Sequence, residues 1–160
     1  MSNLKMDEID HQILQYLIKN CRTPFTEIAK KILVSAGTIH IRVKKMEEMG
    51  IIKGSTLVID YDKMGYSFIA YVGLVTANSK KVNDIIKEIE KIPEVTVAHL
   101  TTGKFSVYCK IRARDTKHAK EIIFKLSDIP GVERTETSIS LEEVINDKKR
   151  LMKHIFDEIK

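Results

Sequence analysis

Residues 35–50 read SAGTIHIRVKKMEEMG, and this stretch decides the fold of the N-terminal part of the chain. Ser35 is suited to the N-cap of a helix, because its hydroxyl can accept a backbone N–H of the first helical turn. Gly50 is suited to the position just after the helix, where a left-handed conformation is common and glycine tolerates it. The two ends therefore predict a helix between Ser35 and Gly50.

The two faces of this helix differ in chemistry. At about 100° per residue, Ile39, Val43 and Met46 fall on one narrow apolar stripe. The opposite face carries small, polar and basic residues with one apolar residue among them: Gly37, Thr38, Ile41, Lys44 and Lys45. An apolar side chain beside cations suits a surface that contacts thymine methyl groups while its neighbours reach base edges and phosphates. The alternative interpretation is an ordinary amphipathic surface helix.

Two helical segments precede this helix. Residues 6–19 carry apolar side chains at helical spacing, with Asp7 placed as the N-cap. Thr23 and Pro24 predict the cap and the first position of a short second helix. Only Leu33 and Val34 then separate the apolar face of that helix from Ser35. So short a connection predicts a tight helix-turn-helix corner.

The segment after Gly50 predicts a β-ribbon. Residues 51–54 and 57–60 are two short apolar pieces around a turn, and we expect both to be extended. Three helices followed by a β-ribbon make a winged helix-turn-helix.

Composition limits the class of protein. The chain has 160 residues, is 43% hydrophobic and 31% charged, and carries a net charge of +5, which favours a polyanionic partner only mildly. No apolar run or N-terminal signal indicates a membrane or secreted protein, so we expect a cytoplasmic one. Cys21 and Cys109 suggest neither a zinc site nor a disulfide framework. No catalytic, metal-binding or phosphate-loop pattern is present, so we expect no enzyme, cofactor or metal.

The second half of the chain contains an internal repeat. Residues 84–95 align with residues 121–132, and each copy is an amphipathic helix that stops at a proline and leads into a strand. With further strands expected over 67–76 and 105–112, the order is β-α-β-β-α-β. This predicts an α+β fold with a ferredoxin-like sandwich. We place the domains at 1–62, 63–143 and 144–160.

The first strand of this half predicts a second copy of the chain. Residues 68–75 are apolar on both sides, although a sheet covered by helices on one face should alternate. Something must therefore cover the other face. A homodimer that packs sheet against sheet is one solution. Residues near the linker or the terminal helix are the alternative.

The chain resembles the Lrp/AsnC family of transcription factors, the feast/famine regulators. The matching features are MDEID at residues 6–10, TEIAK at 26–30 and RVKKMEEMGIIKG at 42–54, in the family's order and spacing. The resemblance extends from Met6 to Leu141. It implies a winged helix-turn-helix that binds double-stranded DNA and a C-terminal RAM/ACT-like domain that senses amino acids. It also implies dimers, which often assemble into octamers.

The resemblance makes residues 35–49 the recognition helix, with Arg42 and Lys45 among its contacts. The candidate DNA-binding residues are Ser35, Gly37, Thr38, His40, Ile41, Arg42, Lys44 and Lys45. His40 is also explained as a partly exposed polar residue on the helix flank. Lys30 and Lys31 either lie near phosphates or are solvated. One such domain neutralises few phosphates, so two half-sites and a dimer are expected.

In the family, the effector binds between subunits near a Gly-x-aromatic-Asp signature. Here residues 101–106 read TTGKFS, with Lys104 and Ser106 where acidic residues are common. The candidate effector-binding residues are His99, Thr101, Thr102, Gly103, Lys104 and Ser106. A lysine would repel an amino group, so we expect backbone contacts, an anionic group on the ligand, or no effector. His99 and Gly103 also have structural explanations, in a strand and in a turn.

Residues 144–160 predict an amphipathic helix that packs against a neighbouring element or subunit, or that adds a nucleic-acid contact. A competing function is an ACT-like small-molecule regulator that acts on protein partners. Single-stranded RNA binding is disfavoured, because the basic face lacks exposed aromatic residues for stacking.

Overall fold

The computed structural model describes residues 6–77, 81–147 and 150–158. It divides the chain into two compact units. One combines the chain up to Leu57 with the segment from Ile145 onward, and the other runs from Val58 to Val144. Over the described residues, no helix combines the length and apolar character needed to cross a membrane.

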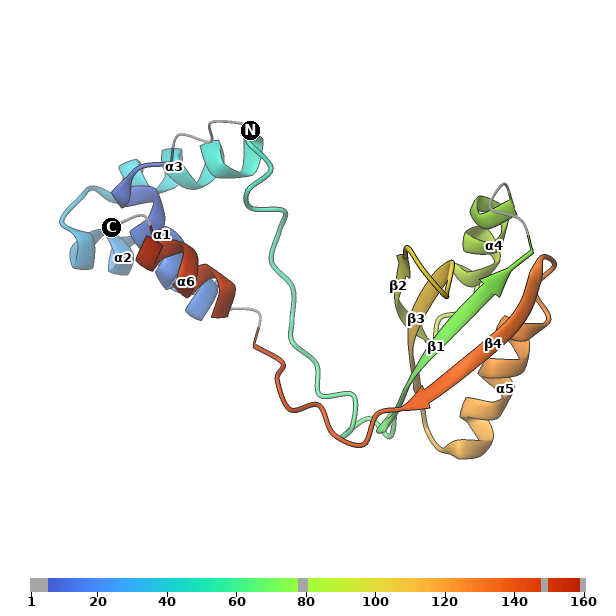
Figure 1. Ribbon diagram of the computed structural model, residues 1–160. Helices are drawn as coiled ribbons and strands as arrows, with labels where there is room; N and C mark the ends of the chain where they lie inside the picture. Colours follow the sequence, from blue (N-terminus) through green and yellow to red (C-terminus); the bar gives the residue numbers. More distant parts are fainter. Residues whose placement is uncertain (1–5, 78–80, 148–149, 159–160) are drawn as a thin grey trace. The chain divides into compact units, whose positions relative to one another are not determined.

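The first unit is built on three helices (Figure 1): α1 (Glu8–Lys19), α2 (Phe25–Ile32) and α3 (Ala36–Glu48). Asp7 caps α1 as expected, in a capping box with Asp10. The expected cap of α2 is wrong: Pro24 is the N-cap residue and makes no side-chain cap bond. Thr23 instead donates its hydroxyl hydrogen bond backward, to the carbonyl of Asn20.

The prediction for α3 is confirmed at both ends and on its inner face. The Ser35 hydroxyl accepts the backbone N–H of Thr38 at 3.0 Å, and Gly50 has a φ of 71°. Ile39, Val43 and Met46 are buried. Their partners in the core include Ile13, Leu14, Ile28 and Ala29 of α1 and α2. The small Ala29 lies in the core of the corner, where a close helix crossing requires it.

The expected β-ribbon after α3 is not formed. In the described residues, the first strand of the chain begins only at Phe68. Ile51 and Ile52 turn inward, pack on the helical core and donate their backbone N–H groups to the carbonyl of Met46. Residues 53–65, which follow them, are exposed. A two-stranded ribbon is only marginally stable in water without a surface to pack on. The apolar residues of this segment were therefore not sufficient to predict two strands.

A last helix, α6 (Arg150–Glu158), belongs to the same unit and packs against α1 (Figure 1). Met152 is half-buried against the core of the three helices. α1, near the start of the chain, and α6, near its end, therefore lie in one unit.

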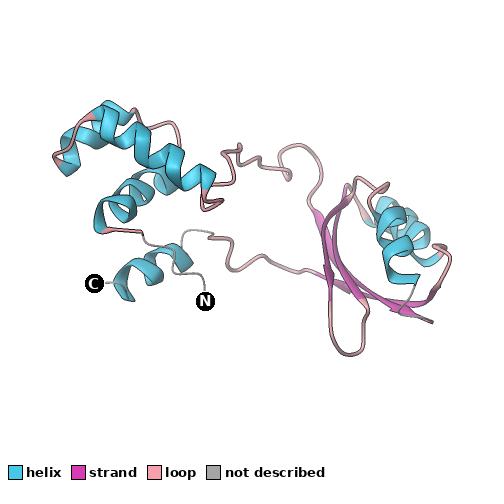
Figure 2. Cartoon of the chain, turned by 90° about the horizontal axis from the view of Figure 1, so that it is seen from above, coloured by secondary structure: helices cyan, strands magenta, loops and turns pink. Residues whose placement is uncertain are grey.

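The second unit has the predicted β-α-β-β-α-β order. Its elements are β1 (Phe68–Thr76), α4 (Val82–Ile89), β2 (Val95–Leu100), β3 (Val107–Ala113), α5 (Thr116–Ser127) and β4 (Val132–Ile139). The strands form an antiparallel sheet in the order β2-β3-β1-β4. Both helices lie on one face of the sheet (Figure 2). This is the expected ferredoxin-like sandwich.

One face of this sheet is covered by the two helices, and the other face is open. Toward the helices, Ala70, Val72 and Leu74 of β1 are buried with alternate residues of β3. Cys109 is among them, and burial raises the pKa of its thiol to about 11, so this cysteine is unreactive. On the open face, Tyr71 stacks on Tyr108 at 6.0 Å. Both rings are half-buried, so the face is partly apolar.

Candidate nucleic-acid interface and effector hairpin

The outer face of α3 consists of Gly37, Thr38, Ile41, Lys44 and Lys45. Ile41 is 69% exposed, although Ile39, two residues earlier, is fully buried. Lys44 and Lys45, three and four residues after Ile41, are exposed and flank it on the next turn of the helix. The ammonium of Lys44 lies 3.9 Å from Glu48. The helix period explains why Ile41 is exposed and Ile39 buried, because Ile39, Val43 and Met46 lie on the opposite side of the helix, in the core. The result is a convex surface with two cations and one apolar side chain.

The first turn of α3 is small and well fixed. The Ser35 hydroxyl also hydrogen-bonds the Thr38 hydroxyl at 2.8 Å, which orients both side chains. A Cβ added at Gly37 would meet only the Ser35 hydroxyl, at 3.7 Å. This end of the helix is therefore shallow enough for a flat or grooved partner to approach the backbone.

His40, Lys30 and Lys31 lie at the edges of this surface. His40 is exposed, and its ring centroid lies 6.1 Å from that of Phe25. Lys31 is paired with Glu27 at 2.8 Å and lies over the Tyr16 ring, so its charge is already compensated. Lys30 is exposed. Of these three residues, Lys30 and His40 could reach a partner that contacts the outer face.

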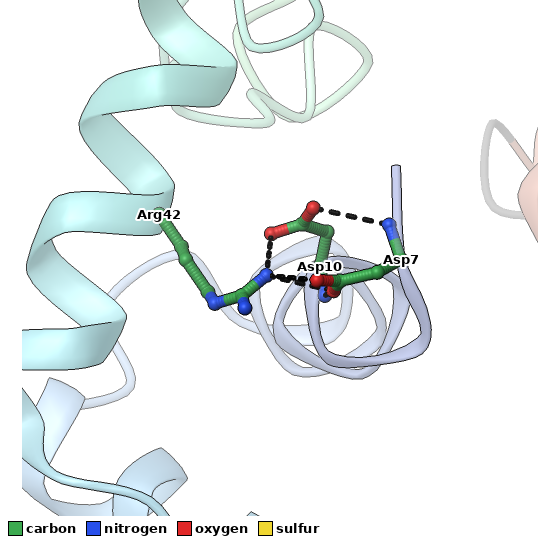
Figure 3. A network of polar contacts seen from close by, with 3 residues as sticks. All are labelled: Asp7, Asp10 and Arg42. Carbon is green, nitrogen blue, oxygen red and sulfur yellow. Dashed lines mark hydrogen bonds and ion pairs between the residues drawn. The ribbon is translucent and has the colours of Figure 1, made fainter. Parts of the chain in front are cut away.

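Arg42 reaches from α3 to the start of α1 (Figure 3). Its Nη1 donates to both carboxylate oxygens of Asp7, at 2.7 and 2.6 Å, and to Asp10 Oδ1 at 2.9 Å. The side chain of Arg42 is 25% exposed and that of Asp10 is 5% exposed. The hydrogen bond from Arg42 holds the pKa of Asp7 below its ordinary value. Arg42 thus ties α3 to the capping box of α1 and lies apart from the outer face.

The effector candidates lie on the hairpin between β2 and β3. The Thr101 hydroxyl donates to the carbonyl of Phe105 at 2.7 Å, and Gly103 has a φ of 104°, which suits glycine in this turn. The Ser106 N–H donates to the carbonyl of Leu74, and its hydroxyl hydrogen-bonds Thr76 at 2.8 Å. The hairpin is therefore fastened to the end of β1.

Lys104 is held by an acidic residue of β4. Its ammonium lies 2.6 Å from Glu136, whose other oxygen lies 3.0 Å from Arg134. The hydrogen bond from Lys104 lowers the pKa of Glu136. Thr102 is exposed at the tip, and His99 is exposed in β2 opposite Tyr108. The hairpin therefore carries a cation and hydroxyl groups, and among the described residues no three His, Cys, Asp or Glu side chains could hold a metal ion.

A half-buried aromatic contact fixes the same hairpin. A Cβ at Gly73 would meet the ring of Phe105 at 2.5 Å, so only glycine lets this ring lie on β1. Phe105 in turn stacks on Tyr108 at 5.7 Å. Glycine at this position of β1 thus serves the hairpin as well as the strand.

Comparison with known proteins agrees with both halves of the chain. Residues 6–53 match the family described as "Winged helix-turn-helix DNA-binding", and residues 69–149 match the "Lrp/AsnC ligand binding domain". The chain is 38% identical to the regulatory protein AsnC of Haemophilus influenzae over 141 residues, which cover 88% of this chain and 94% of that protein. The chain belongs to the Lrp/AsnC family.

Further relatives support membership of the Lrp/AsnC family. The regulatory protein AsnC of Escherichia coli K12 is 34% identical, over 91% of this chain and 96% of that protein. The solved structure of E. coli AsnC has a TM-score of 0.85 at 33% identity and covers 88% of this chain and 95% of that one. This Lrp/AsnC protein is thus a DNA-binding transcriptional regulator. The comparisons do not support the alternative of an ACT-like regulator of protein partners.

Several residues that shape the sites of this Lrp/AsnC protein were not found from its sequence. Asp7 was explained there only as a helix cap. Glu136 and Gly73 were not predicted as site residues, because no neighbouring residue in the sequence indicates that Glu136 lies near Lys104 or that Gly73 lies under Phe105. The β-sheet register, which pairs Gly73 with Glu136, brings these groups together.

Proposed function

We propose that the outer face of α3 enters the major groove of double-stranded DNA. The observation that carries this proposal is the exposure of Ile41 between Lys44 and Lys45 on a helix whose other face is fixed in the core. Lys44 and Lys45 neutralise phosphates or donate to base edges, and Ile41 contacts a thymine methyl group. Ser35, Gly37, Thr38 and His40 line the approach of the helix to the groove.

Arg42 has a different part in this proposal. Its guanidinium is bound to Asp7 and Asp10, so a phosphate would have to compete with two carboxylates for it. Arg42 therefore acts as a positioning residue that sets how α3 is held on α1. The direct contacts are left to Lys44 and Lys45.

The regulator works as a homodimer in this proposal. The open face of the sheet, with Tyr71, Tyr108 and half-buried Ile69, needs a cover, and a second copy supplies it by two-fold symmetry. Two copies also present two recognition helices to two half-sites. The dimer is the unit that binds an operator, and an octamer made of four such dimers would present further half-sites.

The hairpin at residues 101–106 binds a small effector that carries a negative charge. The solved structures of transcriptional regulator NMB0573 from Neisseria meningitidis and of Rv3291c from Mycobacterium tuberculosis, 20% and 22% identical to this chain, are complexes with L-methionine. An amino acid has a carboxylate, and the ammonium of Lys104, which donates to Glu136, keeps further N–H donors for it. The Thr102 hydroxyl adds a donor, while the hydroxyls of Thr101 and Ser106, which already bond Phe105 and Thr76, can accept from the ligand. His99 and Gly103 complete the lining.

The parts of the chain divide accordingly. Residues 1–62 form the DNA-binding domain and linker, residues 63–143 the sensing and dimerisation domain, and residues 144–160 a terminal segment. The expected helix of that segment is shorter than predicted, because residues 144–147 are not helical and α6 begins at Arg150. The chain acts as a cytoplasmic regulator without catalytic activity.

A charge reversal tests the DNA-binding surface. Lys45→Glu is expected to abolish the shift of a duplex selected by the wild-type protein in a gel mobility assay, while its circular dichroism spectrum stays unchanged. Lys125→Glu, an equal charge change at an exposed position of α5, is the control and is expected to bind normally. Unchanged affinity in Lys45→Glu would refute the proposed surface.

A further inference from the structure

The hairpin at residues 101–106 crosses the open face of the sheet. It joins β2 to β3, yet the N–H of Ser106 donates to the carbonyl of Leu74 in β1, and the ring of Phe105 lies against Gly73 of β1. On the other side of β1 lies β4, which is an edge strand of the sheet (Figure 1). The hairpin therefore extends over β1 toward the edge formed by β4.

Three charged side chains meet where the hairpin approaches β4. The Lys104 ammonium lies 2.6 Å from Oε2 of Glu136, and Nη2 of Arg134 lies 3.0 Å from Oε1 of the same carboxylate. Each oxygen of Glu136 thus faces a different cation. The charges follow one another as positive, negative and positive, and we call Lys104, Glu136 and Arg134 the charge triplet.

The strand register places the charge triplet on the open face. Leu74 of β1 is buried toward the helices, so its neighbours Gly73 and Val75 face the other way. Gly73 pairs with Glu136 of β4. Val75 pairs with Arg134, and the side chains of directly paired residues lie on the same face. A ligand can therefore approach the charge triplet from the side that the helices leave uncovered.

The charge triplet has unused hydrogen-bonding capacity. An ammonium carries three N–H donors and a guanidinium five, and the contacts with Glu136 occupy only part of them. The hydrogen bond from Lys104 lowers the pKa of Glu136, so its carboxylate is ionised at neutral pH. The side chains of Lys104 and Arg134 are 59% and 60% exposed. Water screens ion pairs this exposed, so a ligand can rearrange them at small cost.

The sequence of charges selects among small ligands. Two cations and one carboxylate give the charge triplet a net charge of +1. An amino acid with a neutral side chain supplies one carboxylate and one ammonium, which leaves one cation of the triplet without a partner. An amino acid with a second carboxylate presents negative, positive and negative groups in turn. A 2-oxo acid with two carboxylates lacks the ammonium that Glu136 would accept.

We infer that the effector of this regulator is an acidic amino acid, with its α-carboxylate at Lys104, its ammonium at Glu136 and its side-chain carboxylate at Arg134. This inference rests on the proposed function, which assigns an effector with a negative charge to the hairpin, and adds its chemical class. Each contact is a charge-assisted hydrogen bond. The Phe105 ring, whose centre lies 5.3 Å from the Lys104 ammonium, borders the site with an apolar surface for the methylene groups of the ligand.

Calorimetric titration of the full-length protein without DNA tests this assignment. The ligands are L-glutamate and L-aspartate, their amides L-glutamine and L-asparagine, and 2-oxoglutarate. Each amide has nearly the shape of its acid but lacks the second negative charge. We expect at least one of the two acids to bind about tenfold tighter than its amide, because the amide loses a charge-assisted contact. That acid is also expected to bind about tenfold tighter than 2-oxoglutarate.

Variants of the charge triplet assign the individual contacts. Arg134→Gln is expected to reduce the preference for the acid over its amide to less than about threefold and to leave the affinity for the amide unchanged. Arg134→Lys keeps the charge and should keep most of the preference. Glu136→Gln is expected to abolish the preference for the amino acid over 2-oxoglutarate. Lys91→Gln, which breaks an exposed ion pair with Glu88 near α4, removes the same charge as Arg134→Gln and should bind every ligand like the wild type.

The outcomes separate this inference from the proposed function. Amides that bind as tightly as both acids would overturn the inference and leave the proposed effector site in place. A preference for the acid that Arg134→Gln does not reduce would also overturn it. If the wild-type protein binds none of the amino acids and no 2-oxoglutarate, the proposed effector site fails together with the inference.

Discussion

The face of α3 that is turned toward α1 and the outer face of α3 carry similar residues in opposite roles. Ile39 and Arg42 face inward, where one fills the core and the other binds two carboxylates. Ile41 and Lys45 face outward and are exposed. Residue type alone therefore does not identify a DNA contact on this helix. The partners already occupied within the domain decide it.

The largest contrast is expected between the two isoleucines. Ile39→Ala removes a fully buried side chain and is expected to lower the free energy of unfolding by about 3 kcal/mol, whereas Ile41→Ala should change it by less than about 0.5 kcal/mol. Urea denaturation of both variants measures the difference. Ile41→Ala should instead weaken duplex binding. Equal destabilisation by the two changes would show that the outer face is packed against something.

Substitutions of Arg42 and Lys45 are expected to differ in their effect on the free energy of unfolding. Arg42→Met leaves the buried carboxylate of Asp10 without its ion-pair partner and should destabilise the protein by about 2 kcal/mol, while Lys45→Met should have almost no effect on stability. Arg42→Lys, which keeps the charge, is the matched variant and should recover part of the loss. A fully stable Arg42→Met protein would mean that the ion pair is not needed to hold α3.

A substitution in the turn before α3 is expected to have a smaller effect, and to stabilise the protein. Leu33 has a φ of 58° and is 91% exposed, so its side chain occupies a strained backbone position without the benefit of burial. Leu33→Asn is expected to raise the free energy of unfolding by about 0.5 kcal/mol, because asparagine tolerates this conformation better. Thermal unfolding measures the change. A loss of stability would show that Leu33 makes contacts that compensate its strain.

Acid should weaken the inward contact and leave the outer face unaffected. Asp7 has a lowered pKa in the folded protein, so its contribution to stability is present above the pKa of the unfolded chain and is lost as pH falls through the folded value. The stability difference between wild type and Asp7→Asn should therefore be greatest near neutral pH and shrink below about pH 4. A difference that is constant with pH would mean that the ionised carboxylate is not what stabilises the contact.

The sequence predicted well what depends on near neighbours along the chain. The caps and faces of α3 follow from residues within a few positions of each other, and the helix and strand repeat indicated the ferredoxin-like order. The contact of Arg42 with Asp7 joins residues 35 positions apart, and that of Lys104 with Glu136 joins residues 32 apart. Such pairs depend on helix crossing and strand register. The winged helix-turn-helix class is confirmed by the family match, but the two strands expected after α3 are not formed in the described residues. Apolar residues alone do not reveal whether a strand has a partner.

The dependence of DNA affinity on salt tests the two roles most directly. Wild type, Lys45→Gln and Arg42→Gln are titrated with one duplex over a range of salt concentrations. Lys45→Gln is expected to reduce the slope of log affinity against log salt by about 0.9, the value for one lost phosphate contact. Arg42→Gln is expected to weaken binding at every salt concentration without changing the slope. A slope that Arg42→Gln reduces, or that Lys45→Gln leaves unchanged, would contradict the assignment of contact to Lys45 and positioning to Arg42.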